Sequence, residues 1–295
     1  MPITLLNNTI QLEINEPGEN YRGSRFDWTG QITQILYKNK HTFCTNETTR
    51  PEELNILGRG LYNEFGIDAP VDYPDCPLGG KFHKIGVGLL TRKTGEPYDF
   101  FTSYEVAPAE FTIQKMQDTV SFEVNAKPER GYCYKLLKTI TLSESSFIIR
   151  YELTNTGEQS ITTNEYVHNF LAINHKPIDA NYQLKFPFVL NPQTFGAVVN
   201  SKQEVYFDGN SMRWNKLATE TYYFSHVNPP DMKTGSWILE NQLDKIEIRE
   251  SGNFNLLRIN VWGTVHVVSP EIFYPIDLLP GASCNWERKY EIIEL

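Results

Sequence analysis

The histidine at position 168 has neighbours suited to acid–base chemistry on a polar ligand. If residues 161–171 form a strand, alternation puts Asn164, Tyr166 and Phe170 on the same face as His168. Such a face offers hydrogen bonds to hydroxyl groups and a flat apolar surface, which together suit a polyhydroxyl ring such as a sugar. The alternative is a buried histidine that is simply hydrogen-bonded to a backbone carbonyl, as buried polar groups usually are.

The second candidate for proton transfer is Glu271, which lies among apolar residues in the segment 267–274. Burying a carboxylate there is costly unless it is paired or functional. Partial burial would raise its pKa towards the range of a useful base. The alternative is a glutamate at a strand edge that faces water, as most glutamates do.

Three further features could contribute to a ligand site. His83 and Lys84 follow a Gly-Gly pair, so they could reach a sugar hydroxyl or a phosphate from a loop, or form part of a solvated loop. Trp262 could be a stacking platform, although tryptophan is more often buried in the core. Arg25 and Asp27 are close enough in sequence to pair with each other.

Several other functional classes have no support in the sequence. There is no GxSxG, HExxH, P-loop or GxGxxG pattern, and the four cysteines have no zinc-ligand spacing, so we predict no metal and no cofactor. A net charge of −9 without a basic run argues against nucleic acid and membrane surfaces as partners. The first residues lack a secretory pattern, and no apolar run is long enough for a membrane helix, so we expect a cytoplasmic protein with free thiols.

The elements that position these residues are predicted to be strands. Alternation is clearest at 147–154, where Phe147, Ile149, Tyr151 and Leu153 share one face. No amphipathic helix exceeds about three turns, and the strand spacing is typical of an all-β sandwich or barrel. Other predicted strands are 9–14, 32–37, 98–106, 110–117, 120–124, 132–142, 161–173, 182–189, 220–227, 236–240, 245–249, 255–263, 265–274 and 285–293.

Three segments, in order along the whole chain, resemble the galactose mutarotase (aldose 1-epimerase) family. Residues 162–171 resemble the strand that carries its catalytic histidine before an aromatic–Leu pair. Residues 269–281 resemble its C-terminal segment, in which the catalytic glutamate precedes a Leu-x-Pro-Gly turn and a final strand. Residues 23–30 resemble the opening of such proteins. The resemblance, to a divergent subgroup, implies one domain over 1–295: a large antiparallel β-sandwich of the supersandwich kind, with the sugar on a concave sheet face.

The resemblance also implies an activity and a set of site residues. His168 would be the general acid and Glu271 the general base, on opposite sides of the anomeric carbon, interconverting α and β anomers without a cofactor. The partner would be a small-molecule sugar, and the protein a monomer or homodimer. The predicted substrate-binding residues are Arg59, Asn63, Glu64, His83, Lys84, Asn164, Tyr166 and Trp262.

The sequence departs from the family pattern at two places. The family's Asn-Arg pair, whose arginine contacts sugar hydroxyls, reads Asn63-Glu64 here, with only Arg59 nearby. The family's His-Gly-Phe pattern, which supplies a second histidine, becomes Phe82 followed by His83. The missing arginine favours a second hypothesis, a non-catalytic carbohydrate-binding protein on the same fold. A polysaccharide lyase is a weaker alternative, since such enzymes usually add a helical domain that this chain lacks room for.

Overall fold

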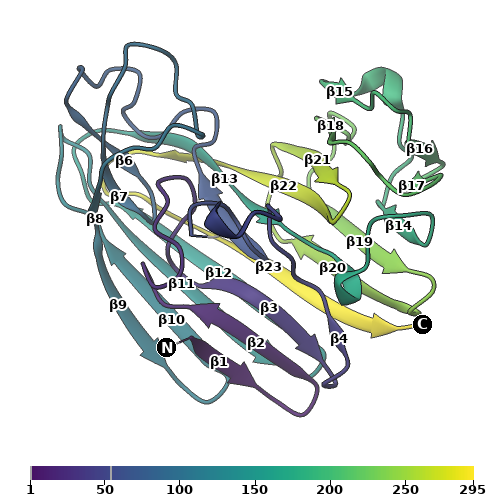
Figure 1. Cartoon of the computed structure of the whole chain (residues 1–295). Helices are drawn as coiled ribbons and strands as arrows, with labels where there is room; N and C mark the ends of the chain where they lie inside the picture. The colour runs from purple at the N-terminus through teal and green to yellow at the C-terminus, as the bar shows by residue number, and fades with distance from the viewer. Residues whose placement is uncertain (1, 54) are drawn as a thin grey trace.

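Two large antiparallel sheets make up most of the computed structural model, which describes residues 2–53 and 55–295 (Figure 1). Within residues 2–53 and 55–295, helical structure is limited to the short 3-10 turns η1 (Pro51–Glu53), η2 (Ile173–His175) and η3 (Pro192–Thr194). Among the described residues, no helix has the length and apolar character that crossing a membrane requires.

The first sheet has ten strands, counted over the described residues. In spatial order they are β1 (Ile3–Leu6), β2 (Ile10–Asn15), β3 (Gln31–Tyr37), β5 (Leu61–Phe65), β13 (Ile161–Asn169), β22 (Val267–Leu278), β21 (Arg258–Thr264), β18 (Tyr222–Phe224) and β15 (Val198–Val199), with β4 (His41–Thr42) paired to β3.

The second sheet also has ten described strands, and a small third sheet has three. The second sheet runs β16 (Val205–Asp208), β17 (Ser211–Trp214), β14 (Tyr182–Lys185), β19 (Ser236–Asn241), β20 (Ile246–Gly252), β23 (Ser283–Glu294), β12 (Ser146–Asn155), β11 (Tyr134–Ser143), β10 (Thr119–Asn125) and β9 (Glu110–Lys115). The third consists of β6 (Lys81–Lys84), β7 (Gly88–Thr91) and β8 (Val106–Pro108).

The apolar core lies between the two large sheets. Leu12 and Ile35 of the first sheet and Phe122 and Ile140 of the second are fully buried in one cluster. The alternation predicted for 147–154 is confirmed, because β12 buries every second residue and exposes or half-buries the others. The neighbouring strands β10 and β11 show the same one-sided burial, whereas β5 of the first sheet is buried on both faces.

A buried ion pair between the sheets decides which face of β13 points inward. Glu165 Oε2 of β13 accepts hydrogen bonds from Arg288 Nη2 (2.7 Å) and Trp286 Nε1 (3.0 Å), both on β23. Arg288 also donates to Glu250 Oε1 (2.7 Å) on β20. Removing one partner of such a pair would leave a buried charge uncompensated, at a cost of about 3–5 kcal/mol. With Glu165 facing inward, alternation turns His168 towards the outer face of the first sheet.

The strand predicted at 98–106 is wrong. This segment is a loop that only becomes β8 at Val106. Asp99 stabilises a turn here, since its carboxylate accepts hydrogen bonds from Phe101 N (3.0 Å) and Thr102 Oγ1 (3.1 Å). Local side-chain bonding of this kind competes with the strand ladder, despite the aromatic residues that favour a strand.

Candidate active site

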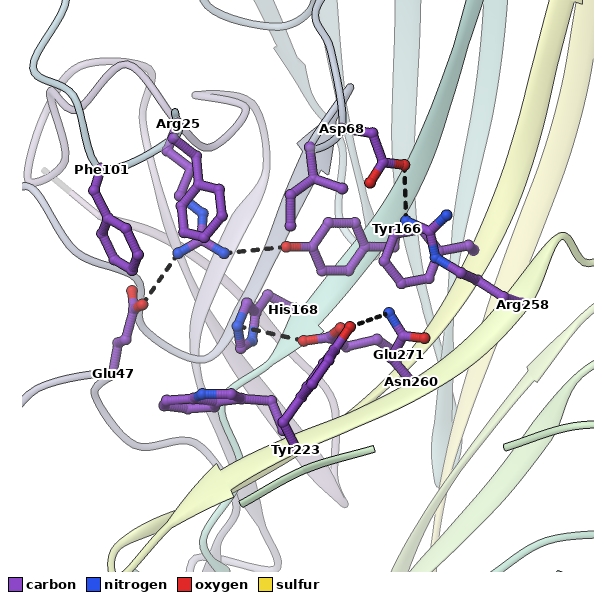
Figure 2. A pocket seen from close by; sticks show the side chains of 14 residues that line it. Arg25, Glu47, Asp68, Phe101, Tyr166, His168, Tyr223, Arg258, Asn260 and Glu271 are labelled. Carbon is purple, nitrogen blue, oxygen red and sulfur yellow. Dashed lines mark hydrogen bonds and ion pairs between the residues drawn. The ribbon is translucent and has the colours of Figure 1, made fainter. Parts of the chain in front are cut away.

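A cavity of about 480 Å³ opens on the face of the first sheet that points away from the second sheet (Figure 2). Both of the residues predicted to transfer protons border it. The lining residues are Arg25, Glu47, Ile67, Asp68, Phe100, Phe101, Tyr166, His168, Tyr223, Arg258, Asn260, Trp262, Glu271 and Phe273. Its size and its mixture of aromatic and polar groups are ordinary for a small-molecule site.

Strand register brings His168 and Glu271 together across β13 and β22. The two strands pair Glu165 with Tyr274, and just beyond the end of β13 an isolated bridge joins Leu171 to Val268. The same register carries His168 opposite Glu271, where cross-strand side chains touch. Two residues far apart in the sequence thus become neighbours through sheet pairing alone.

The two side chains are in direct contact, which differs from the predicted arrangement on either side of a ligand. His168 Nε2 lies 3.3 Å from Glu271 Oε1, and each side chain is only 5% exposed. Ser269 Oγ lies 2.7 Å from His168 Nδ1 and donates to Glu271 Oε1 at 3.3 Å. A sugar can therefore contact the pair from the cavity but cannot lie between its members.

Burial shifts the pKa values of the pair in opposite directions. It raises the pKa of Glu271 from 4.5 to about 8, although the charge of Arg25 opposes the shift. It lowers the pKa of His168 well below 6.5, and Arg25 adds to that decrease. At neutral pH, the imidazole is therefore neutral and Glu271 holds a proton.

Arg25 lies at one wall of the cavity and is held by two carboxylates and a phenol. Its guanidinium donates to Glu64 Oε2 (2.8 Å), Glu47 Oε1 (3.1 Å) and the Tyr166 hydroxyl (3.2 Å). Burial alone would raise the pKa of Glu64, but Arg25 and Lys84 outweigh it and hold that pKa below its usual value. The loop before β3 thus supplies a guanidinium next to position 64, where the resemblance expected an arginine.

The opposite wall carries a second arginine, Arg258 of β21. Its Nη2 donates to Asp68 Oδ2 (2.9 Å), and its guanidinium lies 4.0 Å from the centre of the Phe273 ring. Beside it, Asn260 Nδ2 donates to the Tyr223 hydroxyl (3.1 Å). Figure 2 shows these groups arranged around Glu271.

Of the predicted substrate-binding residues, Tyr166 and Trp262 line the cavity. Glu64 and Lys84 lie just behind its wall, where Lys84 Nζ donates to Glu64 Oε1 at 3.1 Å. Asn164 is also outside the lining, and its Nδ2 donates to Asp68 Oδ2 (2.9 Å).

Three predicted substrate-binding residues lie away from this cavity. Asn63 faces the space between the sheets, where its Oδ1 accepts from Lys138 Nζ (2.6 Å). His83 is buried with its Nε2 against the Tyr132 carbonyl (3.2 Å), and burial lowers its pKa to about 4. Arg59 is exposed and borders a different cavity. For Asn63 and His83 the reason is strand alternation, which turns each side chain inward.

Arg25 and Asp27 do not form the predicted pair. Arg25 binds the carboxylates described above, whereas Asp27 is fully buried and contacts Lys138 Nζ (3.5 Å) of the second sheet. The chain bends over residues 24–26, so it does not keep the extended geometry in which the two side chains would share a face.

Several residues that line the cavity were not predicted from the sequence. Arg258 and Asn260 could have been found, because they alternate with Trp262 along β21 and so share its face. Asn260 is moreover the direct cross-strand partner of Glu271. Glu47, Asp68, Phe100 and Phe101 come from loops and carry no periodic signal.

Comparison with known proteins gives a structural match without a sequence match. No protein-family model and no curated protein sequence matches the chain. Its structure is similar to that of an aldose epimerase homologue from C. elegans (TM-score 0.62, 12% identity, covering 100% of this chain and 99% of that chain). It is also similar to galactose mutarotase-like proteins from Lactobacillus casei (0.60, 12%, 99% and 100%) and Clostridium acetobutylicum (0.59, 12%, 100% and 95%).

These likenesses define the class of protein by its architecture: a large antiparallel β-sandwich with an outward-facing cavity on one sheet. The chain has the galactose mutarotase-like fold, at a sequence distance that fits a divergent subgroup. The predicted fold class is thereby confirmed.

We expect Glu271→Gln to stabilise the protein increasingly as pH rises. The folded pKa of about 8 lies above the ordinary 4.5, so the wild type loses stability as pH rises between these values. Glutamine does not ionise and avoids this loss. In urea unfolding at pH 5, 7 and 9, the free energy of unfolding of the variant should increase relative to that of the wild type as the pH rises.

The exposed Glu144→Gln variant is the matched control and should show no such trend. A difference between Glu271→Gln and wild type that is independent of pH would contradict a raised pKa at Glu271.

Proposed function

We propose that the protein is a cofactor-independent isomerase of the aldose 1-epimerase type, which interconverts sugar anomers with His168 and Glu271. The observation that carries the proposal is their contact, 3.3 Å between Nε2 and Oε1, at the wall of a sugar-sized cavity. The opposite pKa shifts of the two groups support a division into proton donor and acceptor. The fold of the similar structures is consistent with this activity.

The direct contact suits this reaction because of where the protons move. Opening a pyranose removes a proton from the hydroxyl on C1 and delivers one to the ring oxygen. Both oxygens are bonded to the same carbon, so two groups in contact can reach both from one edge of the ring. The contact also stabilises the pair of charges, imidazolium and carboxylate, that forms once His168 has gained a proton and Glu271 has lost one.

At neutral pH the proton lies on Glu271 and not on His168, and this sets the starting roles of the two groups. Nε2 of His168 takes the proton from the C1 hydroxyl, the bond between C1 and the ring oxygen breaks, and C1 becomes an aldehyde. Glu271 gives its proton to the ring oxygen. After rotation about C1–C2, closure returns both protons and completes the cycle. Glu271 is thus the general acid and His168 the general base in ring opening, the reverse of what the resemblance implies, because burial keeps the proton on Glu271.

The charges around the cavity favour a neutral sugar. Arg25 is already bound to Glu47 and Glu64, and Arg258 is bound to Asp68. A phosphate would have to displace a carboxylate from one of these arginines, or lie beside a carboxylate that repels it. Hydroxyl groups, in contrast, can bind to the same carboxylates and guanidinium groups without displacing them.

The proposal is tested by measuring anomer exchange of neutral aldoses by NMR. We expect the wild type to accelerate exchange, and Glu271→Gln and His168→Asn each to lower kcat by about 10²–10⁴, the usual contribution of a positioned acid or base. Glu144→Gln should keep full activity. Sugar binding by calorimetry without any acceleration would instead identify a non-catalytic carbohydrate-binding protein.

The pH dependence follows from the single proton that the pair must hold. Because the pKa of Glu271 is raised to about 8, kcat/KM should fall about tenfold per pH unit above that value. Because the pKa of His168 is lowered well below 6.5, no loss is expected between pH 8 and pH 6.5. The rate is measured after subtraction of spontaneous exchange. A loss centred near pH 6.5 would contradict these roles.

Discrimination against phosphate can be measured directly. Galactose and glucose should be converted with a higher kcat/KM than their 6-phosphates. Asp68→Asn releases Arg258 from its ion pair and should raise the relative rate for the phosphates. Equal or better conversion of the phosphates by the wild type would show that the ion pairs do not set the charge preference.

A further inference from the structure

Ser269 is the one hydroxyl, among the described residues, that bridges the two groups of the acid–base pair. It lies on β22 two residues before Glu271, so both side chains are on the same face of the strand. The serine is completely buried. Its oxygen lies 2.7 Å from His168 Nδ1 and 3.3 Å from Glu271 Oε1.

The hydrogen bond from Ser269 to Glu271 sets the direction of the one between Ser269 and His168. A serine hydroxyl has one proton to donate, and here it is donated to Glu271 Oε1. The serine oxygen must then accept the short hydrogen bond from Nδ1 of His168. A neutral imidazole carries a single N–H, so Nε2 keeps its lone pair.

The other contacts of His168 hold its plane but do not select a tautomer. The ring stacks on Phe170, with centroids 3.9 Å apart and planes 12° apart. The rings of Trp262 and Phe26 lie nearly perpendicular to the imidazole, with centroids 5.4 Å and 6.1 Å from its own. Over the described part of the chain, Nδ1 has no hydrogen-bond partner other than Ser269.

We propose that Ser269 is a positioning residue that fixes His168 as the Nδ1–H tautomer and presents the Nε2 lone pair to the proton it accepts. The assignment of Nε2 as the acceptor of the C1 hydroxyl proton rests on the proposed function, whereas the tautomer itself does not. The same hydrogen bond also stabilises the imidazolium, because Nδ1–H continues to donate to Ser269 after Nε2 is protonated.

The tautomer can be measured without any substrate. In protein labelled with ¹⁵N at histidine, two-bond couplings from the ring protons should show a protonated Nδ1 and an unprotonated Nε2 for His168 at pH 7. The signals are assigned by their loss in His168→Asn. A protonated Nε2 in the wild type overturns the proposal, and this result depends on no variant being folded.

Variants then separate positioning from a merely structural role. Ser269→Ala should give a mixture of tautomers and lower kcat roughly two- to tenfold with an unchanged KM, the size expected for one lost hydrogen bond. Ser269→Thr keeps the hydroxyl and should restore both the single tautomer and kcat. A single unchanged tautomer in Ser269→Ala overturns the proposal.

The outcomes distinguish this inference from the proposed function. If His168 is the Nδ1–H tautomer but no aldose is isomerised, the function fails and the role of Ser269 in setting the tautomer stands. If anomers are exchanged while Nε2 is protonated in the resting protein, the function stands and this inference fails.

Discussion

The structure depends on the buried carboxylate of Glu165 and its ion pair with Arg288 across the sandwich. Both side chains are fully buried, so neither can turn outward without leaving the other as an uncompensated charge. A one-residue slip of β13 would exchange its two faces and break this pair. The ion pair thus determines that His168 faces outward, although it never touches the cavity.

Two consequences of burial meet at the outer face of the first sheet. The same desolvation that makes an ionised Glu271 costly leaves a neutral His168 next to it, so the pair contains one proton donor and one proton acceptor. Arg25, itself held by Glu64, supplies a positive charge nearby, which limits how far the pKa of Glu271 rises. The chain therefore places a proton donor, a proton acceptor and a nearby positive charge around one cavity.

The sequence predicted the strands well and the loops poorly, for a physical reason. Alternation of residue types is local, so the shared face of Tyr166 and His168 and the buried position of Glu271 could be anticipated from the chain itself. Which strand lies beside which is non-local, and so the direct contact of His168 with Glu271 was not foreseen. Buried ion pairs such as that of Arg25 leave no periodic signal in the sequence. The aromatic content of residues 98–106 predicted a strand, but Asp99 stabilises a turn there.

The acid–base pair and the groups around it come from different kinds of structure. His168 and Glu271 lie on the two central strands β13 and β22, whereas Glu47, Asp68, Phe100 and Phe101 reach the same cavity from connecting loops. Loops tolerate substitution and length change far better than paired strands do. Under the proposed function, changes in the loops at the rim alone would alter which ligand is accepted, while β13 and β22 kept His168 and Glu271 in contact.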